Sequence, residues 1–319
     1  MAKRRNKAQR WSPRDLPYLI DSFIEDSPKI LPHIGEDIPW EQRLPNMPSD
    51  PESRYHFFDD IQQELVAHNL KTSMQAMWMA DDLVDLITTT AETMPSWTPQ
   101  NTISDNGFIA FAKPLFFREN LPVEAIAWAT YTPLMPGTSD LTILGLIRTS
   151  HDRIPDAYAQ RNGPFIPLYT FTIQAREAYH PRPSDDDPEA TRLIGTALLL
   201  ANQPDIVTEL TDESVTVSAK RRPLYRRTKP KHRVPLPDVK VRYLTVLPRV
   251  REDVDASEAE HAGLQRGALT QRHWVRGHWR QQPCGPGRTQ IKPVYIKPHL
   301  RGPDHAPIDE RPGVDHLGL

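Results

Sequence analysis

Four apolar runs in the middle of the chain, each bounded by turn-forming residues, constrain the fold of this sequence most strongly. The runs occupy residues 108–112, 125–131, 141–147 and 165–173. Gly, Pro and Asn gather between them, in combinations that are typical of turns. Most of the connections are too short to hold a crossover helix, so we expect neighbouring strands to pair antiparallel. The sequence therefore predicts a central, mostly antiparallel sheet.

Helical patterns lie on both sides of these runs. Apolar residues recur every three to four positions from about residue 54 to residue 93, which predicts helix there. The acidic pair Asp81-Asp82 fits the first turn of such a helix better than a metal site, because carboxylates complement the helix dipole. A second helix is predicted over residues 188–203, with Asp187 as its N-cap and a proline at its first position. The predicted fold class is α+β.

Composition narrows the class of protein further. Proline supplies 33 of the 319 residues, roughly twice the usual share of about 5%, which argues against a bundle of long helices. A single cysteine excludes a disulfide framework and indicates a reducing compartment. No run approaches the roughly 18 apolar residues of a membrane span. We therefore expect a soluble protein of the cytoplasm.

Charge is distributed unevenly along the chain, although the net charge is only -2. Basic residues predominate in a Pro-rich stretch near residue 230, and acidic residues follow it at residues 251–260. We divide the chain into a basic disordered leader (1–10), a helical region (11–100), the sheet with its helix (101–218), a basic Pro-rich connector (219–240) and a C-terminal part (241–319). The C-terminal part contains a strand, an acidic spacer, a basic hairpin and a tail.

The basic hairpin, residues 271–303, has the most unusual composition of the chain. It carries seven Lys or Arg and no Asp or Glu. Polar and apolar residues roughly alternate on both sides of the turn Gly285-Pro286-Gly287, which predicts two strands. Aromatic residues lie between the cations. Such a surface suits a polyanion with exposed bases, because cations neutralise phosphates and rings stack on bases.

We therefore predict that the hairpin binds RNA without catalysing a reaction. In this prediction the cations contact phosphates, the rings stack on bases or hold the hairpin rigid, and His278 forms a hydrogen bond to a base or phosphate. The connector is expected to extend the same surface. The predicted binding residues are Arg272, Trp274, Arg276, His278, Trp279, Arg280, Arg288, Tyr295, Lys297, Arg301, Arg221, Arg222, Arg226 and Arg227.

No strong catalytic or cofactor-binding motif accompanies this surface. One enzymatic alternative is a metal-independent ribonuclease, with His273 and His278 as acid and base and Arg276 or Lys297 stabilising the phosphate. Residues five positions apart on a strand point to opposite faces, which weakens that pair.

Three further alternatives stay open on the residues alone. A zinc site could draw on the hairpin's histidines and its cysteine, although their spacing fits no standard zinc pattern. The rings could instead only pack the strands onto the domain, with the charges in water. The protein could also be a protein-interaction module, such as an antitoxin or virion component. The residues of the zinc alternative are His273, His278, Cys284 and His299.

A resemblance to a known family rests on the same residues. Residues 272–280, the Gly-rich turn after them and the strand closing at residues 298–301 resemble the C-terminal signature of the type V-A anti-CRISPR family. The strongest part is Arg276-Gly277-His278-Trp279, and the end of the apolar helix near Pro204 is a weaker likeness. Members of that family suppress biosynthesis of the CRISPR effector nuclease by causing loss of its messenger RNA during translation. Uncharacterised relatives occur on phages, plasmids and other mobile elements.

The resemblance implies a regulator from a mobile element that acts inside the host cell. Its expected partner is RNA or a translating ribosome complex, with a nascent protein as a further candidate target. No membrane, metal or cofactor is expected to take part.

Overall fold

The fold is that of a computed structural model. The residues that this structure describes are 12–31, 49–99, 103–131, 140–148, 165–175, 177–181, 187–204, 206–209, 241–246, 272–303 and 306–307. The predicted leader (1–10), connector (219–240) and acidic spacer (251–266) lie outside these residues. Within them, no helix has the length and apolar character needed to cross a membrane.

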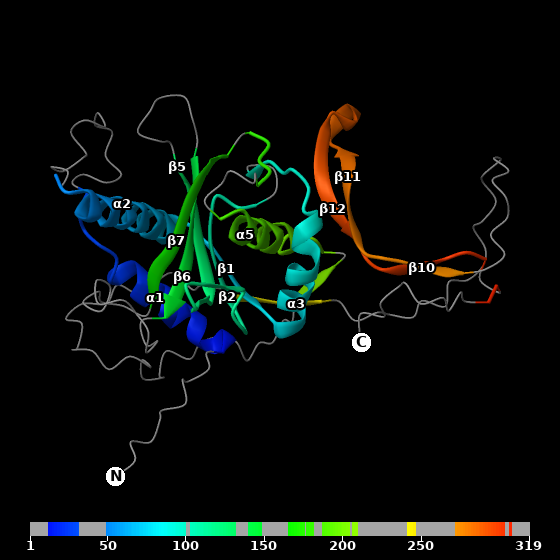
Figure 1. Ribbon diagram of the computed structural model, residues 1–319, viewed down its shortest axis with the longest axis horizontal. Helices are drawn as coiled ribbons and strands as arrows, with labels where there is room; N and C mark the ends of the chain where they lie inside the picture. Colours follow the sequence, from blue (N-terminus) through cyan, green and yellow to red (C-terminus); the bar gives the residue numbers. More distant parts are fainter. Residues whose placement is uncertain are drawn as a thin grey trace, which may run out of the picture.

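A seven-stranded sheet forms the centre of the molecule, in the order β7-β6-β5-β2-β1-β9-β8 (Figure 1). Strands β2, β5, β6 and β7 coincide with the four predicted apolar runs, and they pair antiparallel in succession. This part of the prediction is confirmed, as is a strand near residue 244. The strands are β1 (Gln75–Met79), β2 (Asn106–Phe111), β5 (Ala125–Tyr131), β6 (Asp140–Arg148), β7 (Phe165–Gln174), β8 (Val207–Glu209) and β9 (Val241–Val246).

The helix predicted over residues 54–93 is wrong where β1 runs. This strand pairs parallel with β2 on one side and with β9 on the other, so the sheet is mixed near its centre. Its side chains alternate between the two faces: Ala76 and Trp78 join one core, and Met77 and Met79 join the other. A strand buried on both faces is a continuous apolar run, and periodicity cannot distinguish it from a buried helix.

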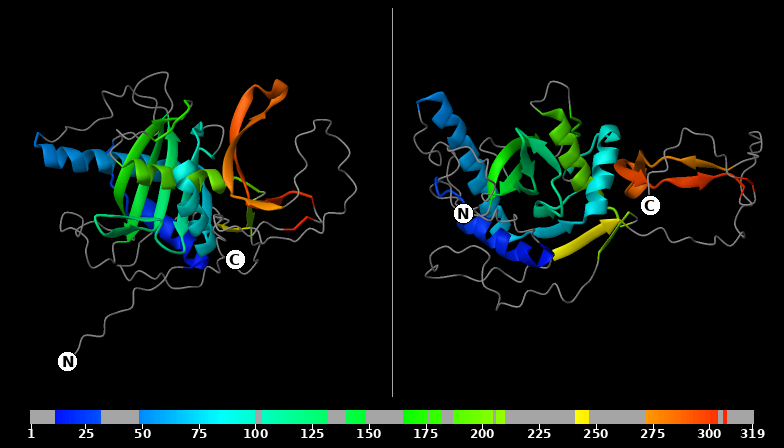
Figure 2. Two further views of the ribbon diagram at one scale, coloured as in Figure 1. Left: turned by 45° about the vertical axis from the view of Figure 1, so that its right-hand side comes forward. Right: turned by 60° about the horizontal axis from the view of Figure 1, so that its bottom comes forward.

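Helices cover both faces of the sheet, giving three layers (Figure 2). Helices α1 and α2 pack on one face, and α3 and α5 pack on the other. Asp81 and Asp82 occupy the first turn of α3, as their charge predicted. We call the sheet with these helices the body. The helices are α1 (Leu16–Glu25), α2 (Pro51–Thr72), α3 (Asp81–Thr90) and α5 (Pro188–Leu200).

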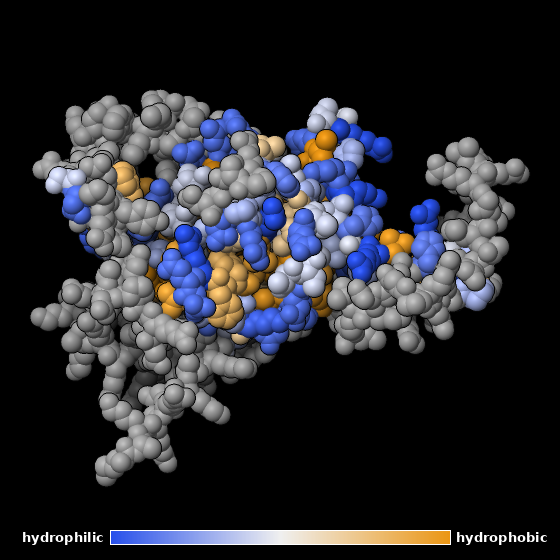
Figure 3. Space-filling model, viewed as in Figure 1, coloured by the Kyte–Doolittle hydropathy of each residue, from blue (hydrophilic) through white to orange (hydrophobic). Residues whose placement is uncertain are grey.

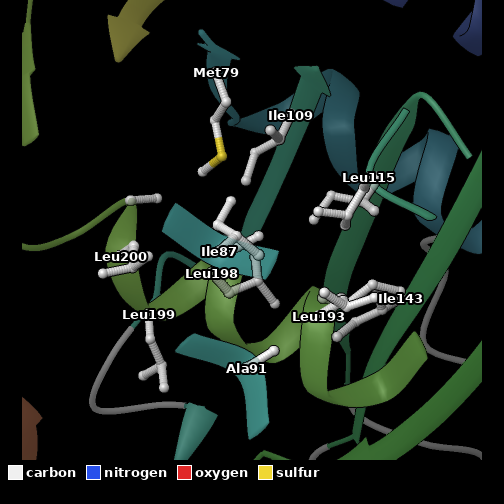
Figure 4. Close-up of a cluster of buried hydrophobic side chains, with 14 of the residues drawn as sticks. Met79, Ile87, Ala91, Ile109, Leu115, Ile143, Leu193, Leu198, Leu199 and Leu200 are labelled. Atoms are coloured by element: carbon white, nitrogen blue, oxygen red, sulfur yellow. The ribbon is translucent and has the colours of Figure 1, made fainter. Parts of the chain in front are cut away.

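The core on the α3–α5 side is the larger one (Figure 4). Figure 4 shows Ile87 of α3 and Leu198 of α5 gathered with Ile109 and Ile143 of the sheet, and all four are fully buried. Burial of such side chains contributes roughly 1.5–3 kcal/mol each. This side of the body is also where the C-terminal strands attach.

Local capping explains where α5 begins. The Asp187 carboxylate accepts a hydrogen bond from the Ala190 N–H at 3.0 Å, and Pro188 occupies the first helical position. The predicted N-cap is therefore confirmed. Tyr169 of β7 holds the same end, because its hydroxyl lies 2.6 Å from the hydroxyl of Thr191. The helix start is thus fixed to the sheet.

A small hairpin follows β2 before the chain returns to the sheet. It consists of β3 (Phe116–Arg118) and β4 (Leu121–Val123), which pair antiparallel. Glu119 and Asn120 between them have φ angles of 51° and 64°. Two successive residues with positive φ form the type I′ turn that suits a two-residue hairpin.

Candidate nucleic-acid interface

The basic hairpin is present as an antiparallel ribbon, residues 272–303, whose two strands follow one another around the turn as predicted. Strand β10 pairs with β13, and β11 pairs with β12. In Figure 1 the β11–β12 part stands beside α3 and α5, while β10 turns away from the body, so the ribbon bends between the two pairs. The strands are β10 (His273–Val275), β11 (His278–Cys284), β12 (Gln290–Ile296) and β13 (His299–Arg301).

One register runs through both halves of the ribbon. His273 lies opposite Arg301, and His278 lies opposite Ile296. Counting inward from either pair places Gly277 opposite Lys297, so neither strand carries an inserted residue. The bend is therefore not a β-bulge, which needs an extra residue on one strand.

Gly277 lies at the bend because no larger residue fits there. A Cβ atom on Gly277 would overlap the Tyr295 hydroxyl and would lie 2.7 Å from Tyr295 Cζ and 3.0 Å from Pro298 Cδ. Pro298, on the other strand, has no N–H to contribute to a strand ladder. The ladder is interrupted at these neighbouring positions, Gly277 on one strand and Pro298 on the other, and the tyrosine ring fills the space.

Two aromatic rings fix the inner face of β11–β12 to the body. Trp279 and Tyr295 lie opposite each other, with ring centroids 5.4 Å apart and planes at 63°. Tyr295 is only 5% exposed and belongs to the α3–α5 core, against which Trp279 also packs. Burial raises the pKa of the Tyr295 hydroxyl. Of the two roles predicted for the rings, packing therefore describes both of these residues.

Three hydrogen bonds reinforce this attachment. All three acceptors belong to the body, at the end of α3, in the segment after the short 3-10 helix η3 (Ala91–Thr93), and just after α5. Trp279 Nε1 donates to the Thr90 carbonyl at 3.3 Å, Gln281 Nε2 to the Ser96 carbonyl at 3.0 Å, and the Tyr295 backbone N–H to Gln203 Oε1 at 2.8 Å.

The outer face of β11–β12 carries exposed polar and cationic side chains beside two half-buried apolar ones, Val294 and Ile296, which pair with Arg280 and His278. Side chains on a strand alternate between faces, so His278, Arg280 and Gln282 lie on the face opposite Trp279. Lys292 shares that face, because it pairs with Gln282. Arg280 and Lys292 are exposed, and Arg280 Nη2 donates to Gln282 Oε1 at 2.9 Å. Figure 3 shows hydrophilic side chains over much of this part of the ribbon, with a hydrophobic patch among them.

The ribbon tip extends past the body. Gly285, Gly287 and Arg288 have positive φ angles of 75°, 65° and 55° around the short 3-10 helix η6 (Pro286–Arg288). Arg288 is exposed there, and the Ile291 side chain beside it is 63% exposed. The tip thus presents a cation at the free end of the ribbon.

The other predicted cations line the rest of the ribbon. Arg276 is exposed at the bend and Lys297 is half-buried there. Arg301 is exposed in β13. Arg272 extends toward the C-terminal segment, where its Nε donates to the Ala306 carbonyl at 2.9 Å. The structure therefore gathers all the predicted hairpin cations on one ribbon.

A family model matches residues 69–302, which is more than half of the chain, and it describes the AcrVA2-like, anti-CRISPR type V subtype A2 family. The chain belongs to this anti-CRISPR family. No curated protein matches it. Among solved structures, the crystal structure of AcrVA2 aligns with 11% identity and a TM-score of 0.43, covering 90% of this chain and 93% of that one.

The family match is wider than the hairpin residues that first indicated it. It begins at the end of α2 and includes β1, the sheet, α3 and α5 as well as the ribbon. Within the AcrVA2-like chain, the segment Arg276-Gly277-His278-Trp279 spans the bend and the first residues that attach to the body. Two of its four residues, Gly277 and Trp279, are thus explained by their contacts within the protein.

The catalytic and zinc alternatives receive no support from this geometry. His273 and His278 belong to different strand pairs, on either side of the bend. Cys284 lies at the other end of β11. Among the residues that the structure describes, no three His, Cys, Asp or Glu side chains come close enough together to hold a metal ion.

Some predicted residues lie outside the described part of the structure, and several residues that attach the ribbon were not predicted from the sequence. Trp274 lies opposite Leu300 in β10, and the connector arginines 221, 222, 226 and 227 lie outside the described residues. The attachment residues Gln203 and Gln281 were not predicted. A sequence signal exists for the outer face, since His278, Arg280 and Gln282 alternate along β11 and therefore share one side. No sequence pattern marks Gln203, which lies 92 residues from its partner.

Proposed function

We propose that this AcrVA2-like protein acts by binding RNA through the outer face of its ribbon. The observation that carries the proposal is the two-sided character of β11–β12. The face with Trp279 and Tyr295 is attached to the body, and the face with Arg280 and Lys292 is exposed and cationic. A rigid cationic face with no acidic neighbour in the ribbon is suited to the phosphate backbone of a nucleic acid.

Attachment of the inner face favours binding by the outer one. An isolated two-stranded hairpin is marginally stable at best, and ordering it on a ligand would reduce affinity. The hydrogen bonds to Thr90 and Gln203 remove this cost before the ligand arrives. The exposed cations can then release counterions from RNA without first folding the ribbon.

The target in this proposal is the messenger RNA of a CRISPR effector nuclease while it is translated. The family membership supports an anti-CRISPR role, and the resemblance of the ribbon residues implies loss of that messenger. The place of action is then the cytoplasm of the host cell, and the partner is RNA or the translating ribosome complex. Target selection by a nascent protein would be an additional contact outside the ribbon.

A salt series tests the RNA-binding step. The purified protein is titrated into labelled RNA at several salt concentrations, beside the double variant Arg280→Ala/Lys292→Ala and the control Lys71→Ala, an exposed cation of α2. The double variant should bind more weakly and lose about 1.4 units of the slope of log K against log salt, since each phosphate contact to single-stranded RNA contributes about 0.7. The control should match the parent chain.

The same samples separate the other candidate functions. RNA fragments on denaturing gels would indicate a nuclease instead. Absence of binding at physiological salt would contradict the proposal and favour a protein-interaction module. Equal loss of affinity in Lys71→Ala would show that net charge matters and the ribbon does not. In cells, the double variant should leave effector messenger levels higher than the parent chain does.

A further inference from the structure

Two histidines of the ribbon have the same local geometry. His278 Nδ1 lies 3.1 Å from the carbonyl oxygen of Arg276, and His299 Nδ1 lies 3.1 Å from the carbonyl oxygen of Lys297. In both cases the acceptor is two residues earlier and belongs to a cation. Gly277 separates the first pair and Pro298 the second. The ribbon therefore repeats the unit cation, Gly or Pro, histidine, once on each strand at the bend.

This geometry determines which ring nitrogen faces outward. A carbonyl oxygen can only accept, so Nδ1 must carry the hydrogen in both rings. In a neutral imidazole the lone pair then lies on Nε2, which becomes a hydrogen-bond acceptor. Both histidine side chains are exposed. The bend thus presents two exposed acceptors, one on each face of the ribbon, because the register pairs His299 with Val275 and places it on the face opposite His278. Each lies two residues from a cation.

A hydrogen-bond acceptor beside a cation that binds phosphate indicates which donor group the ligand must supply. The sugar-phosphate backbone of DNA offers such a nitrogen no donor, whereas every RNA nucleotide offers a 2′-hydroxyl. We propose that His278 and His299 accept hydrogen bonds from 2′-hydroxyl groups and make the ribbon select RNA over DNA. This inference rests on the proposed function, and it assigns His299 a role that packing and charge alone do not require.

The test compares binding of RNA and of DNA that have the same nucleotide sequence. Labelled single-stranded RNA and DNA of the same sequence are titrated with the parent chain, His278→Ala/His299→Ala and His278→Gln/His299→Gln. A hydrogen bond contributes roughly 0.5–1.5 kcal/mol and about 1.4 kcal/mol corresponds to tenfold, so the parent should prefer RNA by on the order of tenfold. The alanine variant should lose that preference while DNA affinity stays the same. Glutamine retains an acceptor and should restore most of it.

Controls separate this inference from RNA binding itself. His273→Ala changes a half-buried histidine of β10, and it should leave the RNA-to-DNA ratio unchanged. Arg280→Ala should weaken both nucleic acids equally. Salt-dependent binding with a ratio that the alanine variant does not move would overturn the role of the histidines and leave the proposed function intact. No binding to either nucleic acid would overturn both.

Discussion

The body and the ribbon use aromatic and apolar residues in opposite ways. In the body, strands such as β1 and β2 send side chains into cores on both faces, so no face is left for a ligand. In the ribbon, only the face with Trp279 and Tyr295 enters a core, and its other face carries Arg280 and Lys292. A two-stranded ribbon is too small to stabilise itself, and this one is stabilised by the body.

This difference predicts that the residues needed for stability and the residues needed for RNA binding lie in different parts of the molecule. Changes in the body should affect folding of the whole chain, and changes at the attachment should release the ribbon while the body stays folded. Changes on the outer face should affect neither.

Replacing Trp128 in the body should have the largest effect. The ring is fully buried in β5 against Gly107, and its Nε1 donates to the Ser104 carbonyl at 2.9 Å. Trp128→Ala should lower the free energy of unfolding by about 3–5 kcal/mol, measured by urea denaturation. Phe117→Ala, at a side chain that is 66% exposed, should change it by less than about 0.5 kcal/mol. Similar values for the two variants would contradict the packing described here.

Replacing Gly277 should release the ribbon and spare the body. A methyl group there would occupy the position of the Tyr295 hydroxyl, and overpacking of this kind costs about 1–3 kcal/mol. Gly277→Ala should therefore speed hydrogen exchange at the Tyr295 amide, which Gln203 otherwise protects, with exchange in β5 unchanged. Gly287→Ala, at the tip, is the control: alanine is strained there by the positive φ, but the strain lies away from Tyr295 and should leave the Tyr295 amide protected. Faster exchange in β5 as well would show that body and ribbon unfold together.

The smallest effect concerns pH. Burial raises the pKa of Tyr295 above its ordinary value, so the folded ribbon favours the neutral phenol. The attachment is fully stable below the unfolded-state pKa of about 10 and weakens as the pH rises through the higher folded-state pKa. Trp279 fluorescence should report this release in alkaline solution. The change should disappear in Tyr295→Phe, and a change that persists there would assign it to other groups.

Sequence patterns predicted much of this protein because the relevant signals are local. Strands β2, β5, β6 and β7 follow from apolar runs between turns, and Asp187 with Pro188 marks the start of α5. The alternation around Gly285-Pro286-Gly287 predicted the ribbon. Strand β1 was missed, since burial on both faces removes the period-two signal that distinguishes a strand from a helix.

The sequence by itself determined the cationic character of residues 271–303, because seven Lys or Arg without an acid must give a basic surface wherever the segment lies. It could not determine which side of that surface would be free. Only the tertiary structure places Thr90, Ser96 and Gln203 against the ribbon, from segments 92 or more residues away. Those contacts bury Tyr295 and leave Arg280 exposed. Long-range packing leaves no local pattern, and here it decides which residues can meet a ligand.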